Sequence, residues 1–169
     1  GAGPVTVPRI TVCGLGPGGA GSVTTATLDA IERSTVRFLR TTRHPTAHLV
    51  TGAASFDHLY EAADSFDQVY AAITDALVAA ATGAASPGPG AAGESVLYAV
   101  PGSPLVLEDS VRRLRADGRV EVELVPALSF LDEAWARLGV DPVDDGVRLV
   151  DGHRFGVQAA GERGPLLVA

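Results

Sequence analysis

Lysine and methionine are absent from this 169-residue sequence, so all 13 of its basic residues are arginines. The 20 acidic residues bring the formal net charge to −7, and no basic stripe is present to bind nucleic acid. No apolar run approaches the ~20 residues that cross a membrane, and no secretory signal is visible. We therefore predict a cytoplasmic protein whose partners are neither nucleic acids nor membranes.

The sequence is also poor in residues for metal or nucleophilic chemistry. Its single cysteine, Cys13, cannot form an internal disulfide, which fits a reducing compartment. No Gly-x-Ser-x-Gly nucleophile turn occurs, and the acidic helix motifs that a pyrophosphohydrolase needs for magnesium are missing. The four histidines lack the spacing of metal ligands, so no metal site is predicted; they are His44, His48, His58 and His153.

The most informative segment lies near the N-terminus. An apolar run at residues 10–12 enters a glycine- and proline-rich turn at residues 14–18. A helical pattern follows, with Ser22 or Thr24 as N-cap. Its expected apolar face consists of Val23, Ala26, Leu28 and Ile31. A strand, a glycine turn and a helix form the entry unit of an α/β sheet, where backbone groups can approach a small molecule closely.

Strand and helix patterns then alternate along the chain. Strands are expected at residues 36–39, 95–100, 120–125 and 147–150, with a short strand or turn at residues 56–60. Helices are expected from Phe66 to Leu77, from Leu105 to Leu114, and from Leu131 to Leu138. This order predicts an α/β fold with a doubly wound, mostly parallel sheet whose ligands bind at the carboxyl ends of the strands.

Two further segments bear on the domain organisation. Residues 83–93 are of low complexity and read as a surface loop. Residues 155–158 and 166–168 read as strands of another unit. We therefore expect one domain over residues 1–151, followed over residues 152–169 by the opening strands of a truncated second domain.

The glycine turn by itself leaves alternatives open. Gly14, Gly16 and Gly19 have the spacing of the dinucleotide-binding fingerprint. Pro17 removes an N–H from that turn, and the second strand ends at an arginine rather than at a carboxylate for a ribose. An arginine there could instead meet a 2′-phosphate, so NADP binding stays a candidate, as does a tight turn that binds nothing.

Several motifs taken together resemble a known family. Residues 10–18 (ITVCGLGPG), 98–104 (YAVPGSP) and 126–129 (PALS) are similar to the signature turns of the tetrapyrrole (corrin/porphyrin) methylases. Residues 40–45 (RTTRHP) resemble the branch of that family fused to MazG-type nucleotide pyrophosphohydrolases. The resemblance implies an N-terminal α/β domain, a second α/β domain that supplies the other wall of a cleft, and S-adenosylmethionine between them. It also implies a homodimer, for which apolar residues such as Leu59, Tyr60 and Phe66 could supply surface. The simpler interpretation, and the favoured one, is that these residues belong to the core.

The resemblance assigns site residues position by position. It implies a cofactor-binding set of Pro17, Pro101, Gly102, Ser103, Val106, Ser129 and Phe130. Ser103 and Ser129 also fit the simpler role of helix N-caps. On the substrate side the implied residues are Gly16, Gly18, Arg40, Arg43 and His44. The two arginines and the histidine would form a cationic edge for a small anionic or tetrapyrrole-like substrate, or they would belong to a solvated loop.

Three positions depart from the family pattern. Many members have aspartate where this chain has Ser103, glycine where it has Ala127, and, in the uroporphyrinogen branch, an acidic residue where it has Arg40. Arginine accepts no proton at neutral pH, so no catalytic acid or base is assigned. The leading expectation is an S-adenosylmethionine-dependent methyltransferase. A non-catalytic ligand-binding or regulatory domain of a pyrophosphohydrolase fusion is the alternative.

Overall fold

The structure is a computed structural model that describes residues 7–84 and 94–169, so most of the loop predicted over residues 83–93 lies outside the described residues. The chain divides into two compact units, Gly1–Phe130 and Leu131–Ala169.

The first unit is built on a parallel sheet of five strands in the order β3-β2-β4-β1-β5. Strand β1 lies between β4 and β5, so that Val12 pairs with Tyr98 on one side and with Leu124 on the other. The strands are β1 (Arg9–Gly14), β2 (Val36–Leu39), β3 (Ala54–Ser55), β4 (Val96–Val100) and β5 (Glu121–Val125). The predicted α/β class with a mostly parallel sheet is confirmed.

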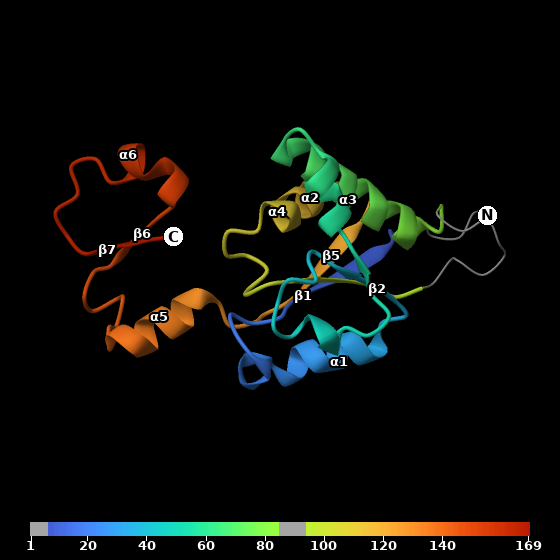
Figure 1. Cartoon of the computed structure of the whole chain (residues 1–169), viewed down its shortest axis with the longest axis horizontal. Helices are drawn as coiled ribbons and strands as arrows, with labels where there is room; N and C mark the ends of the chain where they lie inside the picture. Colours follow the sequence, from blue (N-terminus) through green and yellow to red (C-terminus); the bar gives the residue numbers. More distant parts are fainter. Residues whose placement is uncertain (1–6, 85–93) are drawn as a thin grey trace. The chain divides into compact units, whose positions relative to one another are not determined.

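Helices cover both faces of this sheet (Figure 1). On one face lies α1 (Thr25–Arg33), and on the other lie α2 (Asp57–Ala62), α3 (Phe66–Thr82) and α4 (Asp109–Ala116). The core consequently has two apolar layers. One contains Ile73 and Leu77 of α3, and the other contains Cys13 of β1 and Ala30 of α1. Burial raises the pKa of the Cys13 thiol to about 12, so this cysteine is part of the packing and is not a nucleophile.

Helix α1 begins after Thr24, whose hydroxyl accepts a hydrogen bond from the backbone N–H of Thr27 at 3.1 Å. This settles the N-cap in favour of Thr24. The expected apolar face was wrong in part: Leu28 is 42% exposed and Ala26 is exposed, whereas Thr27 is buried. Thr27 is accommodated in the core because its hydroxyl donates to the Gly14 carbonyl oxygen at 2.9 Å.

Two other elements differ from the sequence prediction. Residues 57–62 form helix α2 after the very short strand β3, so the short strand or turn expected at residues 56–60 was wrong. Ser55 and Asp57 explain the helical start, because the backbone N–H of Asp57 donates to the Ser55 hydroxyl at 3.0 Å. Helix α4 begins at Asp109 and not near Leu105, with Glu108 at its N-cap position. Ser103 therefore lies well before the helix, and its N-cap role was wrong.

Residues proposed to face a dimer partner are divided between core and surface. Leu59 and Tyr60 pack against the apolar core, as the simpler interpretation of these residues requires. Phe66 is 69% exposed and stacks on Tyr70 with ring centroids 6.2 Å apart.

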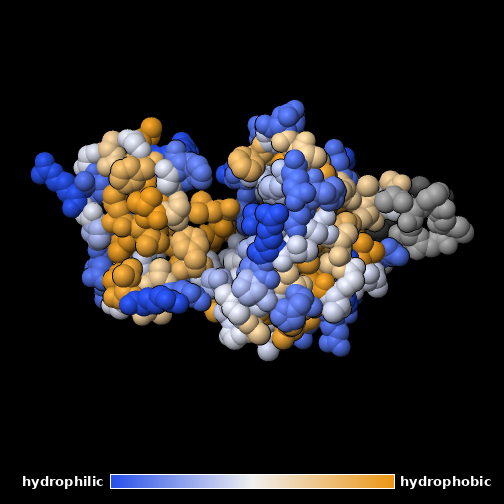
Figure 2. Space-filling view, viewed as in Figure 1, coloured by the Kyte–Doolittle hydropathy of each residue, from blue (hydrophilic) through white to orange (hydrophobic). Residues whose placement is uncertain are grey.

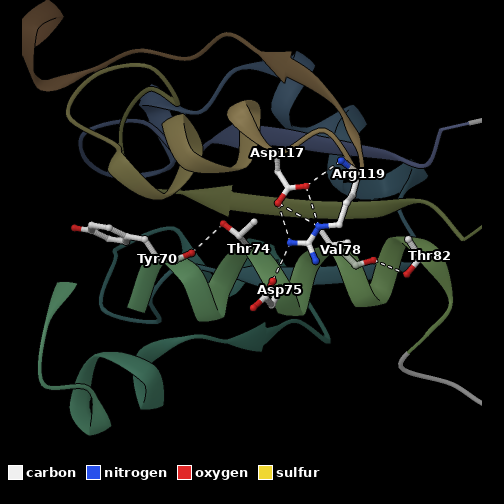
Figure 3. Close-up of polar contacts among 7 residues, drawn as sticks. All are labelled: Tyr70, Thr74, Asp75, Val78, Thr82, Asp117 and Arg119. Atoms are coloured by element: carbon white, nitrogen blue, oxygen red, sulfur yellow. Dashed lines mark hydrogen bonds and ion pairs between the residues drawn. The ribbon is translucent and has the colours of Figure 1, made fainter. Parts of the chain in front are cut away.

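Helix α3 is tied to the segment that follows α4 by a charged cluster (Figure 3). Arg119 Nη2 lies 2.8 Å from Asp75 Oδ1 on α3 and 2.8 Å from Asp117 Oδ2. The backbone N–H of Arg119 also donates to Asp117 Oδ1 at 2.9 Å. Hydrogen bonds from Arg119 lower the pKa of Asp117 to about 2. The cluster fixes the turn that leads into β5.

The second unit contains α5 from Leu131 onward (the helix spans Phe130–Leu138), β6 (Arg148–Val150), α6 (Phe155–Gln158) and β7 (Leu166–Val168). Strands β6 and β7 pair in parallel with Leu149 opposite Leu167, so β6 belongs to this small sheet. The strand expected at residues 155–158 was wrong, because those residues form α6, whereas the strand at residues 166–168 is confirmed. Figure 2 shows apolar residues gathered on the viewed face of this unit. No helix within residues 7–84 and 94–169 is long and apolar enough to span a bilayer.

Candidate cofactor-binding site

Three turns meet at the carboxyl edge of the first unit's sheet. They follow the neighbouring strands β1, β4 and β5, at residues 15–18, 101–104 and 126–129. Backbone hydrogen bonds join the first two turns. The N–H of Gly102 donates to the Gly16 carbonyl oxygen at 2.9 Å, and the N–H of Gly16 donates to the Gly102 carbonyl oxygen at 3.2 Å. The pair extends the β1–β4 ladder beyond the strands as an isolated antiparallel bridge.

Gly14 lies at the point where all three turns approach one another. A Cβ atom at this position would lie 2.1 Å from the Gly102 carbonyl oxygen and 2.5 Å from the Cβ atom of Ala127. Both distances are far inside van der Waals contact, so only glycine allows this approach. Gly16 is restricted in another way, because its φ of +75° lies in the left-handed region.

A histidine from a different turn supports the Gly16 turn. His44 Nε2 lies 2.9 Å from the Gly16 carbonyl oxygen, and the backbone N–H of Thr46 donates to His44 Nδ1 at 3.2 Å. The Thr46 hydroxyl in turn donates to the Leu15 carbonyl oxygen at 3.1 Å. The turn after β2 is thereby attached to the turn after β1.

These turns enclose a pocket of about 260 Å³. Its lining combines polar groups with the apolar side chains of Val106, Leu107 and Phe130. The complete lining is Gly16, Pro17, His44, Pro101, Gly102, Ser103, Val106, Leu107, Ser129 and Phe130. All seven residues of the expected cofactor-binding set belong to this lining. Two residues of the expected substrate-side set, Gly16 and His44, belong to it as well.

The other expected substrate-side residues lie outside the pocket lining. Gly18 is half-buried, next to Pro17. Arg43 is 80% exposed and pairs with Glu61 of α2 at 3.4 Å. Arg40 is mostly buried and pairs with Glu108, with its Nε atom 3.3 Å from Glu108 Oε1. The expected cationic edge therefore consists of one exposed arginine, one buried arginine and a histidine engaged in a backbone contact.

Asp57 holds the turn that carries the two arginines. Its Oδ2 atom accepts hydrogen bonds from the Thr42 backbone N–H at 2.9 Å, from the Thr42 hydroxyl at 2.8 Å and from the Ser55 hydroxyl at 2.8 Å. Desolvation opposes the ionised form, but these hydrogen bonds outweigh it and hold the pKa of Asp57 well below its usual range. Asp57 was not expected from the sequence, because nothing in its neighbourhood marks it as a partner of Thr42.

Two more functional candidates were missed. Leu107 lines the pocket and has a φ of +54°, the one positive φ among the described non-glycine residues. A leucine in the left-handed region is strained, and such strain concentrates at functional sites. Glu108 was missed because it lies inside the helix expected from Leu105 to Leu114, and nothing in the local sequence marks it as a buried partner of Arg40. Its side chain is 6% exposed, and burial raises the pKa of Glu108 to about 7 although Arg40 opposes this shift.

The described residues contain no group of three or more histidine, cysteine, aspartate or glutamate side chains that could hold a metal ion.

Comparison with known proteins gives this pocket its context. Residues 9–158 match the family described as Tetrapyrrole (Corrin/Porphyrin) Methylases. The chain belongs to this family. It is also 33% identical over 150 residues to the protein YabN of Bacillus subtilis (strain 168), an alignment that covers 85% of this chain and 28% of YabN. The chain thus spans little more than a quarter of the length of that relative.

Solved structures with the same fold include two methyltransferases. Uroporphyrin-III-C-methyltransferase from Thermus thermophilus aligns with a TM-score of 0.67 and 20% identity, over 96% of this chain and 68% of that one. Precorrin-6Y methylase from Archaeoglobus fulgidus aligns with a TM-score of 0.62 and 23% identity, over 95% of this chain and 72% of that one. At these identities the likeness establishes the fold.

Proposed function

We propose that this chain forms the S-adenosylmethionine-binding part of a methyltransferase that acts on a small anionic or tetrapyrrole-like substrate. The observation that carries the proposal is the convergence of the seven expected cofactor-binding residues, from three separate turns, on one pocket. Members of the family use S-adenosylmethionine as methyl donor, and this pocket lies at the carboxyl ends of parallel strands, where α/β sheets bind ligands.

The composition of the pocket fits part of such a cofactor. Backbone groups of the turn at Pro101–Ser103 and the Ser103 side chain can bind the ammonium and carboxylate of an amino acid. Val106, Leu107 and Phe130 offer apolar surface to the less polar remainder. The volume of about 260 Å³ is slightly below the ~300–1,000 Å³ of typical ligand sites, so we expect these turns to hold one end of the cofactor and other residues to bury the rest.

The chemistry expected at this site makes few demands on side chains. S-adenosylmethionine supplies a methyl group on a positively charged sulfur, ready for in-line attack by the substrate. The protein has to orient the donor and the acceptor and to exclude water, and such positioning alone can supply a large part of the rate enhancement. The bridge between Gly16 and Gly102 and the His44 contact fix the pocket walls, as this role requires.

The substrate side is proposed to be the cationic edge formed by the turn after β2. Arg43 is exposed and Arg40 is partly so, and both can bind carboxylates. The likeness of residues 40–45 to the MazG-fused branch supports placing the protein there.

Calorimetry with S-adenosylhomocysteine on the full-length protein tests the proposal. We expect the affinity for S-adenosylhomocysteine to fall by at least ~tenfold in Val106→Trp, because the larger side chain fills the pocket. The affinity should be unchanged in Leu28→Trp, the control substitution at an exposed leucine of α1. Binding without methylation of any offered tetrapyrrole would favour the alternative, a ligand-binding regulatory domain. Binding of NADPH with none of the adenosyl ligand would overturn the proposal.

A further inference from the structure

Arg40 and Glu108 form a charge pair beside the pocket whose two members are unequally buried. Arg40 directly follows β2, and its backbone N–H donates to the Ala99 carbonyl oxygen of β4 at 3.0 Å. Its side chain is 29% exposed, whereas that of Glu108 is 6% exposed. Glu108 directly follows Leu107, which lines the pocket. The arginine is thus the more accessible member of the pair, and the carboxylate is almost fully buried.

Groups from four elements surround the Glu108 carboxylate. The Ser110 hydroxyl donates to Glu108 Oε2 at 3.4 Å and lies 2.8 Å from the Tyr98 hydroxyl of β4. The other charged and titratable groups that influence this cluster are Arg40 after β2, Tyr60 of α2, Tyr70 of α3, and Asp109 and Arg112 of α4. Arg40 is thus the cation nearest to Glu108, in a largely desolvated position.

The pair leaves hydrogen-bonding capacity unused. Within residues 7–84 and 94–169, the buried side-chain polar atoms without a hydrogen bond are Arg40 Nε and the Tyr60 hydroxyl oxygen. Arg40 Nε is close to Glu108 Oε1, at 3.3 Å, but is not aligned for a hydrogen bond. Arg40 also interacts with the Tyr60 hydroxyl, so the two groups lie close together. Buried polar groups are nearly always hydrogen-bonded, so two neighbouring groups without a well-aligned hydrogen bond favour a site that takes a further partner.

We propose that Arg40 is the main anion-binding side chain of this site and that Glu108 is its positioning residue, which neutralises Arg40 when ionised and releases it to a carboxylate ligand when protonated. The inference rests on the proposed function only for placing that ligand beside the cofactor pocket. Arg43 has the same charge but is exposed and pairs with the equally accessible Glu61, so screening by solvent limits its contribution.

A consequence of this arrangement is that ligand binding and proton uptake are coupled. A carboxylate that approaches Arg40 is repelled by ionised Glu108, and protonation of Glu108 removes the repulsion. Since the pKa of Glu108 is raised to about 7 by burial, the change occurs near neutral pH. Above that pH, each further pH unit lowers the affinity for the carboxylate ligand by up to ~tenfold, because one proton must be bound together with the ligand.

The test is a fluorescence titration of the full-length protein with uroporphyrin III, a porphyrin that carries carboxylates, at constant ionic strength between about pH 6 and about pH 8. We expect the affinity of the unmodified protein to fall by ~tenfold across this range. Glu108→Gln should keep the low-pH affinity throughout. Arg40→Gln should bind weakly at every pH. Glu61→Gln, which removes the partner of Arg43, should keep the pH dependence of the unmodified protein and serves as the matched control.

The outcomes separate this inference from the proposed function. It is overturned if Glu108→Gln retains the pH dependence, if Arg40→Gln retains the affinity, or if no porphyrin binds at any pH. Calorimetry with S-adenosylhomocysteine on the same proteins reports on the cofactor pocket independently. Porphyrin binding with the expected pH response but without the adenosyl ligand supports this inference and contradicts the proposed function. Should Glu108→Gln not fold, Arg40→Gln alone decides.

Discussion

The imidazole of His44 donates a hydrogen bond from Nε2 to the carbonyl oxygen of Gly16 across 2.9 Å. The direction follows from the other side of the ring, where Nδ1 accepts the backbone N–H of Thr46 and therefore carries no proton. A histidine expected on the substrate side thus acts as a brace between two turns of the site. This brace connects the turn after β2, which we propose binds anions, to the glycine turn after β1.

Replacing His44 by phenylalanine should therefore loosen the pocket as well as the fold. The ring shape is kept while both hydrogen bonds are lost, so we expect a loss of ~1–2 kcal/mol in stability and a several-fold weaker binding of S-adenosylhomocysteine. Urea denaturation and calorimetry measure the two effects. His48→Phe is the control, because the contact of His48 is to the Pro45 carbonyl oxygen and does not reach the glycine turn. Equal effects of both variants would contradict the brace.

Gly14→Ala should be among the most damaging single substitutions in the chain. The added methyl group would meet backbone and the Ala127 side chain at 2.1–2.5 Å, and neither can move without displacing a turn. We expect a loss of at least ~3 kcal/mol of stability, measured by chemical denaturation. Gly19→Ala is the matched control in the same turn region, since a Cβ there meets nothing within 4 Å. Comparable stability of the two variants would show that the three turns do not pack as described.

Asp57→Ala should release the turn that carries Arg40 and Arg43. The variant loses the acceptor for the Thr42 N–H and for two hydroxyls, so amide exchange at Thr42 and Arg43 should accelerate while exchange in the central strands stays slow. Hydrogen exchange followed by mass spectrometry or NMR measures this directly. Asp64→Ala is the control on a neighbouring exposed carboxylate. Unchanged protection at Thr42 in the Asp57 variant would contradict the role given to this residue.

The glycine turns were predictable because each is short, follows an apolar strand and needs residues that permit a close approach. Long-range partners were not predictable in this way. Glu108 contacts Arg40 only because parallel pairing brings the carboxyl ends of β2 and β4 to one edge of the sheet. No local sequence pattern predicts this contact. The residues 105–107 looked helical because they are apolar, yet Leu105 and Leu107 are more than half exposed and form a turn at the pocket. Tertiary context outweighed local propensity at these residues.

The buried Glu108 also predicts a pH dependence of stability whose sign is fixed by its environment. Burial raises the pKa of Glu108 to about 7 in the folded chain, above the ~4.3 of an unfolded one. The stabilising contribution of this group is therefore fully present below about pH 4 and is lost as the pH rises through about 7. Glu108→Gln cannot ionise, so it should be more stable than the unmodified protein at about pH 8, by ~1–3 kcal/mol, and the difference should vanish near pH 4.

Urea denaturation of the unmodified protein, Glu108→Gln and Glu61→Gln at these two pH values measures this difference. The Glu61 variant removes an equal charge from an exposed pair with Arg43, so it should show no such gain at the higher pH. A Glu108→Gln protein that is less stable than the unmodified one at about pH 8 would mean that attraction to Arg40 exceeds the cost of burying the carboxylate. The carboxylate would then stay ionised at neutral pH, and Arg40 would stay neutralised.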